Sequence, residues 1–229
     1  MMLSPSHGER RDGGFPQLIV LHYTAMESAR AAFDRLCNPA VEVSAHYLIS
    51  EVGEVQQLVA EDRRAWHAGA GQWGEITDVN SHSIGIELAL HVTDDRAPPF
   101  PAKQMDALES LLRGLMARYS LGPHRVIGHS DLAPGRKNDP GRAFDWRRLA
   151  RQGLSVWYEP QADQPATQTD FFENARRFGY PPAEEAAVLD AFRQRFRPWD
   201  RSPGPNDADR AAVADLAARY PVDLKAAQA

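Results

Sequence analysis

The sequence predicts an α/β fold, with a central mixed β-sheet flanked by helices and a small C-terminal domain of three helices. Two observations support this prediction. Between residues 15 and 150, short apolar runs alternate with amphipathic segments, which is typical of a sheet covered by helices. After Trp157 the composition changes to a segment rich in Pro and Gln, followed by helical patterns only.

Five short segments have the composition of strands. The first, Gln17 to Leu21, is apolar and β-branched, as expected of a buried strand. A hairpin turn centred on Gly53 joins the second to the third. The fourth is unusual because it carries a carboxylate, Glu87, within an apolar run. The five expected strands are 17–21, 46–50, 55–59, 83–90 and 125–128.

Two helices are expected among these strands. A short helix over 26–36 is stopped by Asn38-Pro39. A stronger helix begins after Pro101 and ends at Gly122-Pro123. Its apolar residues recur at helical spacing and predict one buried face: Met105, Leu108, Leu112, Leu115 and Tyr119. Residues 66–83 have no such period, contain several glycines and predict a surface loop.

The predicted domain boundary lies at residues 158–167, which have the composition of a linker. We therefore expect one domain over 1–157 and a second, helical domain over 168–229. Its three helices are predicted at 170–178, 183–196 and 207–220.

Composition excludes several classes of protein. The 229 residues include 26 Lys and Arg against 31 Asp and Glu, so a broad basic nucleic-acid surface is excluded. The single cysteine, Cys37, excludes an internal disulfide and any zinc site built from several cysteines. No apolar run reaches membrane length, and the first 14 residues lack the apolar core of a signal peptide. We expect a cytoplasmic protein without a membrane or an obligate protein partner.

Three residues of ligand type stand at or near the ends of apolar strands. His22 follows the strand that ends at Leu21, and His129 follows Gly128. Asp139 lies ten residues later, in a segment too rich in Pro and Gly to be helical. Two histidines and one carboxylate are the ligand composition of a catalytic zinc site with an open position. A packed or capping histidine and a turn-forming aspartate are the alternatives at these positions.

Glu87 and Lys137 are candidates for the chemistry beside that site. A carboxylate in an apolar strand is costly unless it is paired or lies near a metal, and Gly85 would leave space beside Glu87. An outward-facing residue on a half-buried strand is the alternative. Lys137 precedes Asp139 by two residues, so in an extended segment both side chains would point the same way. Its ammonium group would then stabilise an oxyanion, unless it is simply a solvated loop lysine.

These residues lie in segments that closely resemble the type-2 N-acetylmuramoyl-L-alanine amidases, a family of zinc peptidoglycan amidases related to the peptidoglycan recognition proteins. The resemblance runs from about residue 15 to residue 150, in the order of the family. Its segments are LHYT at 21–24, SAHYLIS at 44–50, RAWHAG at 64–69, SIGIEL at 83–88 and GHSDLAPGRKNDPG at 128–141.

The resemblance implies a role for each matching residue. His22, His129 and Asp139 match the zinc ligands, Glu87 matches the catalytic glutamate, and Lys137 matches the lysine before the aspartate ligand. The implied reaction is hydrolysis of the lactyl-amide bond between N-acetylmuramic acid and L-alanine.

Four further residues are tentative substrate contacts. Trp66 and His67 stand in the WHAG segment and are expected to line the groove for sugar and peptide, with a structural tryptophan as the alternative. His46 and Tyr47 stand at a strand start that we expect near the site.

The sequence also departs from the family. An export signal and a lipid-anchored cysteine, as in its lipoprotein members, are missing, whereas the cytoplasmic members usually end soon after the aspartate ligand. The C-terminal helices faintly resemble a peptidoglycan-binding domain through residues 192–198. We expect a cytoplasmic recycling enzyme acting on 1,6-anhydro-N-acetylmuramyl peptides. A non-catalytic muropeptide sensor and a wall-lytic, endolysin-type amidase are the alternatives.

Overall fold

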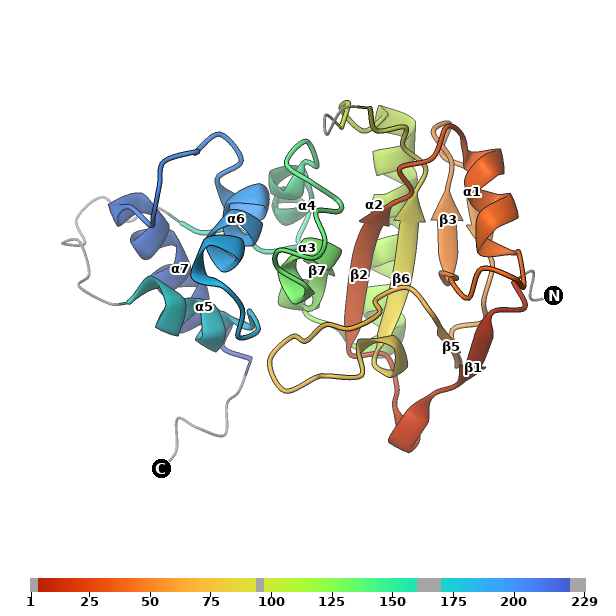
Figure 1. Cartoon of the computed structure of the whole chain (residues 1–229), viewed down its shortest axis with the longest axis horizontal. Coiled ribbons are helices and arrows are strands. Elements are labelled where there is room, and N and C mark those ends of the chain that lie inside the picture. Colours follow the sequence, from red (N-terminus) through yellow and green to blue (C-terminus); the bar gives the residue numbers. More distant parts are fainter. Residues whose placement is uncertain (1–3, 94–96, 160–169, 223–229) are drawn as a thin grey trace.

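The computed structural model describes residues 4–93, 97–159 and 170–222. Its centre is a five-stranded sheet with the order β4-β3-β6-β2-β7 (Figure 1). β3, β6, β2 and β7 run parallel, and β4 pairs antiparallel with β3 at one edge. The strands are β2 (Leu18–Tyr23), β3 (Tyr47–Ile49), β4 (Val55–Gln57), β6 (Ser83–Leu88) and β7 (Val126–Gly128). The predicted mixed sheet flanked by helices is confirmed.

Alternation along β2 and β6 assigns their side chains to two different layers. Ile19 and Leu21 join Ile84 and Ile86 in a core beneath α2 (Ala102–Tyr119). Leu18 and Val20 face the opposite way and pack against the loop of residues 66–83. Because side chains alternate with a period of two, His22 and Glu87 share the loop-covered face.

Two strands and two α-helices among the described residues before 158 lie outside the predicted set. β1 (His7–Glu9) and β5 (Arg63–Ala65) form a separate two-stranded antiparallel sheet. Each is three residues long, so neither shows a readable period, and their pairing joins segments far apart in sequence. The short helices α3 (His129–Leu132) and α4 (Trp146–Arg151) lie in stretches to which the sequence analysis assigns no element. The predicted short helix is α1 (Ala29–Leu36), which starts after the cap residue Ser28.

The three C-terminal helices lie beside the β7 edge of the sheet, next to α3 (Figure 1). They are α5 (Phe171–Phe178), α6 (Glu185–Phe196) and α7 (Asp207–Arg219), close to the predicted ranges. Their apolar residues do not form a core of their own. They join Leu18, Val20, Trp73 and Ile127 in one continuous buried cluster. Most of the expected linker, 160–167, lies outside the described residues.

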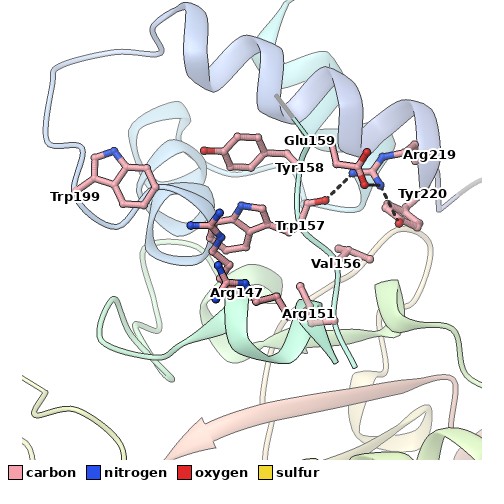
Figure 2. A pocket seen from close by; sticks show the side chains of 11 residues that line it. Arg147, Arg151, Val156, Trp157, Tyr158, Glu159, Trp199, Arg219 and Tyr220 are labelled. Atoms are coloured by element: carbon pink, nitrogen blue, oxygen red, sulfur yellow. Dashed lines mark hydrogen bonds and ion pairs between the residues drawn. The ribbon is translucent and has the colours of Figure 1, made fainter. Parts of the chain in front are cut away.

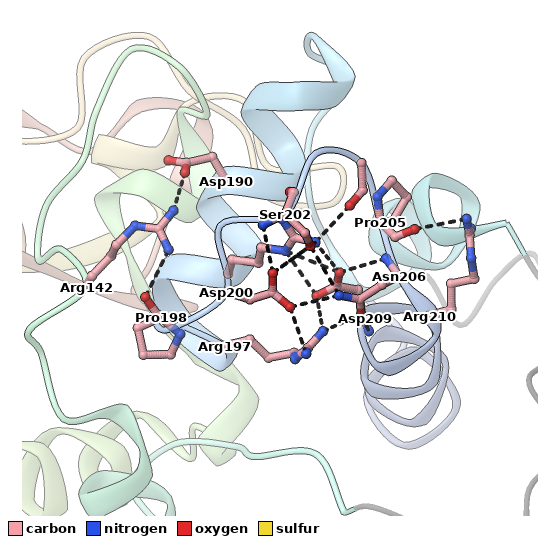
Figure 3. A network of polar contacts seen from close by, with 12 residues as sticks. Arg142, Asp190, Arg197, Pro198, Asp200, Ser202, Pro205, Asn206, Asp209 and Arg210 are labelled. Atoms are coloured by element: carbon pink, nitrogen blue, oxygen red, sulfur yellow. Dashed lines mark hydrogen bonds and ion pairs between the residues drawn. The ribbon is translucent and has the colours of Figure 1, made fainter.

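A buried polar network holds the loop between α6 and α7 (Figure 3). Asp209 is fully buried and accepts hydrogen bonds from Arg193 and Arg197, both on or next to α6. Asn206 caps α7 by accepting from the Asp209 backbone N–H, and its own N–H donates to the Asp209 carboxylate. A buried carboxylate with this many charged donors is fully satisfied, which keeps the loop ordered.

Candidate active site

The carboxyl ends of three neighbouring parallel strands carry the candidate residues. His22 and Glu87 lie opposite each other in the register of β2 and β6. His129 follows β7 directly and starts α3. Ligands commonly bind beyond the carboxyl ends of parallel strands, and here the topology brings together side chains that are far apart in sequence.

His22, His129 and Asp139 converge on one point. The His22 Nδ1 atom lies 2.8 Å from Asp139 Oδ2 and 3.0 Å from His129 Nδ1. The His129 Nδ1 atom lies 3.0 Å from the same carboxylate oxygen. All three residues are buried, with exposed fractions of 1%, 2% and 8%. In the described part of the chain, they are the one group of His, Cys, Asp and Glu residues with the geometry to hold a metal ion.

The hydrogen bonds around His129 show that this cluster suits a cation. Its Nε2 atom lies 2.9 Å from the carbonyl oxygen of Ala68, so Nε2 carries the proton. In the neutral ring, Nδ1 is therefore a bare lone pair that faces a carboxylate oxygen. Two lone pairs at this distance repel each other unless a cation lies between them. Imidazole nitrogen and carboxylate oxygen are zinc ligands, so the donor set fits the metal that the sequence predicts.

Burial favours the neutral forms of the surrounding histidines. Desolvation and the nearby His129 lower the pKa of His22 to about 4. Desolvation also lowers the pKa of His67 well below its ordinary value. Both rings are consequently neutral at pH 7, the state in which an imidazole can bind a metal.

Glu87 faces the same pocket with one free oxygen. Its Oε2 atom is buried and has no hydrogen-bond partner among the described residues. Desolvation and the charge of Asp139 raise the pKa of Glu87 to about 8, although Lys137 opposes the shift. A carboxyl group whose pKa lies near neutrality is suited to accept and return a proton.

The pocket around these residues has a volume of about 380 Å³. Its lining includes Glu87, Lys137 and Trp66, together with the three candidate metal ligands. The structure therefore places Lys137 and Trp66 in the wall of this pocket, and their contact with a substrate stays a prediction. Arg35, on α1, also lines the pocket and was not among the predicted residues.

His67 lines the pocket too, but its ring is held in place by protein atoms on several sides. Its Nδ1 atom lies 3.0 Å from His22 Nε2, and its Nε2 atom lies 3.1 Å from the Ser83 hydroxyl. The ring occupies the space left by Gly85, where an added Cβ would lie 2.4 Å from the His67 Cγ atom. The glycine thus makes room for the His67 ring and not, as expected from the sequence, for Glu87.

His46 and Tyr47 point elsewhere. His46 is fully buried; its Nδ1 atom accepts from the Gly85 N–H, and its Nε2 atom lies 3.0 Å from the Arg63 carbonyl oxygen. The Tyr47 hydroxyl donates to the Glu61 carboxylate. Neither residue lines the pocket around Glu87. The structure gives both residues structural contacts in place of the expected substrate contacts, because the start of β3 is covered by the segment 61–65.

Three polar residues that support the site were missed in the sequence. The Asn80 side-chain oxygen accepts from the backbone N–H groups of both His67 and Ala68. Ser83 contacts His67, and Asp131 accepts from the Gly128 N–H just before His129. Asp131 follows His129 by two residues within the GHSD segment, which was the available signal. Asn80 stands in an aperiodic loop, where no pattern in the sequence indicates a role in the site.

A second hollow, of about 440 Å³, lies between α4 and the end of α7 (Figure 2). The described residues that line it include no histidine. Arg219 donates to the Trp157 carbonyl oxygen and packs against the Tyr220 ring. These contacts fasten α7 to residues 157–159, and the hollow shares no residue with the pocket around Glu87.

The known proteins that this chain resembles are N-acetylmuramoyl-L-alanine amidases. The family model described as N-acetylmuramoyl-L-alanine amidase matches residues 12–142. The amidase AmiD of Escherichia coli is 34% identical over 227 residues, which cover 87% of this chain and 81% of AmiD. The 1,6-anhydro-N-acetylmuramyl-L-alanine amidase AmpD of Enterobacter cloacae is 35% identical, over 64% of this chain and 85% of AmpD.

Two similar solved structures contain muropeptides. The complex of E. coli AmiD with anhydro-N-acetylmuramic acid-L-Ala-D-γ-Glu-L-Lys has a TM-score of 0.81 at 31% identity and covers 94% of both chains. AmpDh3 from Pseudomonas aeruginosa in complex with anhydromuramic pentapeptide has a TM-score of 0.81, also at 31% identity, and covers 97% of both chains. Within the described residues, no helix combines the length and the apolar character needed to cross a membrane.

Proposed function

The chain belongs to the N-acetylmuramoyl-L-alanine amidase family, and from that premise we propose that it is a zinc enzyme that releases the stem peptide from 1,6-anhydro-N-acetylmuramyl peptides. The observation that carries this proposal is the convergence of His22, His129 and Asp139 beside a carboxyl group with a free oxygen. The muropeptides named in the two similar complexes support the anhydro sugar as the substrate end.

His22 Nδ1, His129 Nδ1 and Asp139 Oδ2 would hold the zinc ion. When bound, zinc lowers the pKa of a water molecule toward neutrality and polarises the amide carbonyl of the substrate. The pocket side chains supply the proton chemistry. Glu87 takes the proton of the attacking water on its free oxygen and returns it to the amine of the leaving L-alanine. The ammonium group of Lys137, which lines the same pocket, stabilises the negative charge that develops on the carbonyl oxygen.

Mass spectrometry of a reaction with purified anhydromuropeptide tests the activity. We expect free stem peptide and anhydro sugar from the zinc-loaded protein. His129→Ala should lose both zinc and activity, whereas Glu87→Gln should keep zinc and lose turnover, because Glu87 is not a ligand. Absence of product from the folded, zinc-loaded protein would refute the proposal, and full turnover in Glu87→Gln would refute the role of that residue.

Two measurements test the cellular role: the preference of the enzyme for soluble muropeptides or intact sacculi, and the cell fraction in which it is found. We propose that the enzyme acts on soluble fragments in the cytoplasm, as expected from the sequence. Faster release from anhydromuropeptides than from intact sacculi would support this role, and the reverse preference would favour wall lysis. Fractionation of the producing cells, with an antibody against the chain, tests the location directly.

A further inference from the structure

A chain of hydrogen bonds leads from a backbone carbonyl to His22 Nε2, the ring nitrogen that faces away from Asp139 and His129. The Ser83 hydroxyl lies 2.6 Å from the Val79 carbonyl oxygen. A carbonyl oxygen can only accept, so the single proton of this hydroxyl points to Val79. The Ser83 oxygen is therefore an acceptor toward the next group in the chain, the His67 ring.

Each following proton position is determined by the one before it. Because the Ser83 oxygen accepts, His67 Nε2 carries the proton, and the Nδ1 atom of the neutral ring is bare. The bare Nδ1 atom accepts from His22 Nε2 at 3.0 Å. His22 therefore holds its proton on Nε2, and its Nδ1 lone pair is directed at Asp139 and His129.

A neighbouring backbone carbonyl likewise fixes the proton position of His129, the second candidate histidine ligand. The carbonyl oxygen of Ala68 accepts from His129 Nε2, which leaves His129 Nδ1 bare. The Asn80 oxygen fixes residues 67 and 68 together through their N–H groups. One loop, held by one amide side chain, thus sets the tautomer of both histidines.

We propose that His67 is a positioning residue that, together with Ser83, holds His22 in the tautomer that binds metal. Without His67, the metal-free protein has a better alternative for His22. A proton on Nδ1 would form a hydrogen bond to Asp139 Oδ2, 2.8 Å away, and would block the ligand atom. In the intact chain this alternative would leave two bare nitrogens, His22 Nε2 and His67 Nδ1, facing each other at 3.0 Å.

Nitrogen NMR of the metal-free protein tests the tautomer directly. We expect a larger fraction of His22 to be protonated on Nε2 in the wild type than in His67→Phe, which keeps an aromatic ring but has no acceptor. His82→Phe is the matched control, because His82 precedes Ser83 and its ring bonds to the Asp78 carbonyl oxygen, not to His67 or His22. An unchanged His22 tautomer in folded His67→Phe would overturn the proposal.

Zinc affinity, measured by competition with a chromophoric chelator, gives the second readout. Loss of a group that orients a ligand typically lowers metal affinity by about 10- to 100-fold, and we expect that loss in His67→Phe but not in His82→Phe. Gly85→Ala keeps every hydrogen-bonding group and displaces the His67 ring by steric overlap, so it should weaken zinc binding as well. Wild-type zinc affinity in both His67→Phe and Gly85→Ala would overturn the proposal.

This inference rests on the proposed metal role of His22, but the two can fail separately. If the wild type binds zinc and does not cleave muropeptide, the proposed function fails while the tautomer measurement still applies. If the wild type cleaves muropeptide and His67→Phe keeps its zinc affinity and its His22 tautomer, only the role of His67 fails.

Discussion

Replacing Arg195 with methionine would remove the cation from a fully buried ion pair between α6 and α3. The Arg195 Nη1 atom donates to Asp131 Oδ2 at 2.8 Å, and the two side chains are 1% and 0% exposed. The Nη2 atom donates to the Val126 carbonyl oxygen at 2.9 Å. The guanidinium also lies 4.5 Å from the centre of the Trp146 ring.

The substitution leaves the Asp131 charge buried without its cation. The Gly128 N–H and the Tyr180 hydroxyl still donate to this carboxylate, but both are neutral. Breaking a buried pair by removing one partner costs roughly 3–5 kcal/mol, and we expect the free energy of unfolding to fall by about that amount. Domains of this kind have only about 5–15 kcal/mol of stability, so the loss is a large fraction.

Urea denaturation, followed by tryptophan fluorescence, measures this loss. Arg30→Met is the matched control, because Arg30 pairs with Asp34 on the surface, with side chains 80% and 54% exposed. The control should change the free energy of unfolding by less than about 1 kcal/mol. A similarly small change in Arg195→Met would refute the reasoning that this buried pair stabilises the packing of α6 on α3.

Three other predictions concern the site and the chain length. Lys137→Met should lower kcat by about 10²–10³ with little change in zinc affinity, since Lys137 acts on the developing oxyanion; a change confined to KM would contradict this. Between pH 4.5 and about 8, the folded metal-free protein keeps a proton on Glu87 that the unfolded chain releases, so this group lowers the free energy of unfolding as pH rises. The advantage in stability of metal-free Glu87→Gln over the wild type should thus grow across that range, and a constant difference in urea titrations would contradict the raised pKa. A chain ending at residue 158 should lack fixed tertiary structure by near-ultraviolet circular dichroism, because Trp73 and the strand cores lose the helices that cover them; a native-like spectrum would show that the first 158 residues fold alone.

Local patterns were sufficient for the main elements of the fold. The apolar runs before His22 and around Glu87 are strands, and the periodic stretch after Pro101 is the long helix α2. The pairing of β1 with β5 was missed, because two polar three-residue strands have no local signal and meet only in the tertiary structure. Similarly, the short helices α3 and α4 are held by tertiary contacts such as the burial of Trp146.

Which residues are candidates for the site could be predicted from the sequence, whereas the direction of their side chains could not. Residue type and the local sequence around each residue were enough to nominate His22, His129, Asp139 and Glu87, and the motif order linked them to one family. Side-chain direction could not be read in the same way. His46 stands in a motif segment as His67 does, yet its two ring nitrogens face the backbone of neighbouring strands.

The sequence by itself determined the class of fold, the family and the residues able to hold a metal, because these depend on residue type, spacing and the alternation of side chains along strands. Only the tertiary structure decided which nitrogen of each histidine is free, because that depends on groups such as Ala68 and Ser83 that the fold brings into contact. It also decided that the C-terminal helices share a core with the sheet, since burial of Trp73 against Phe178 and Tyr180 joins segments about a hundred residues apart.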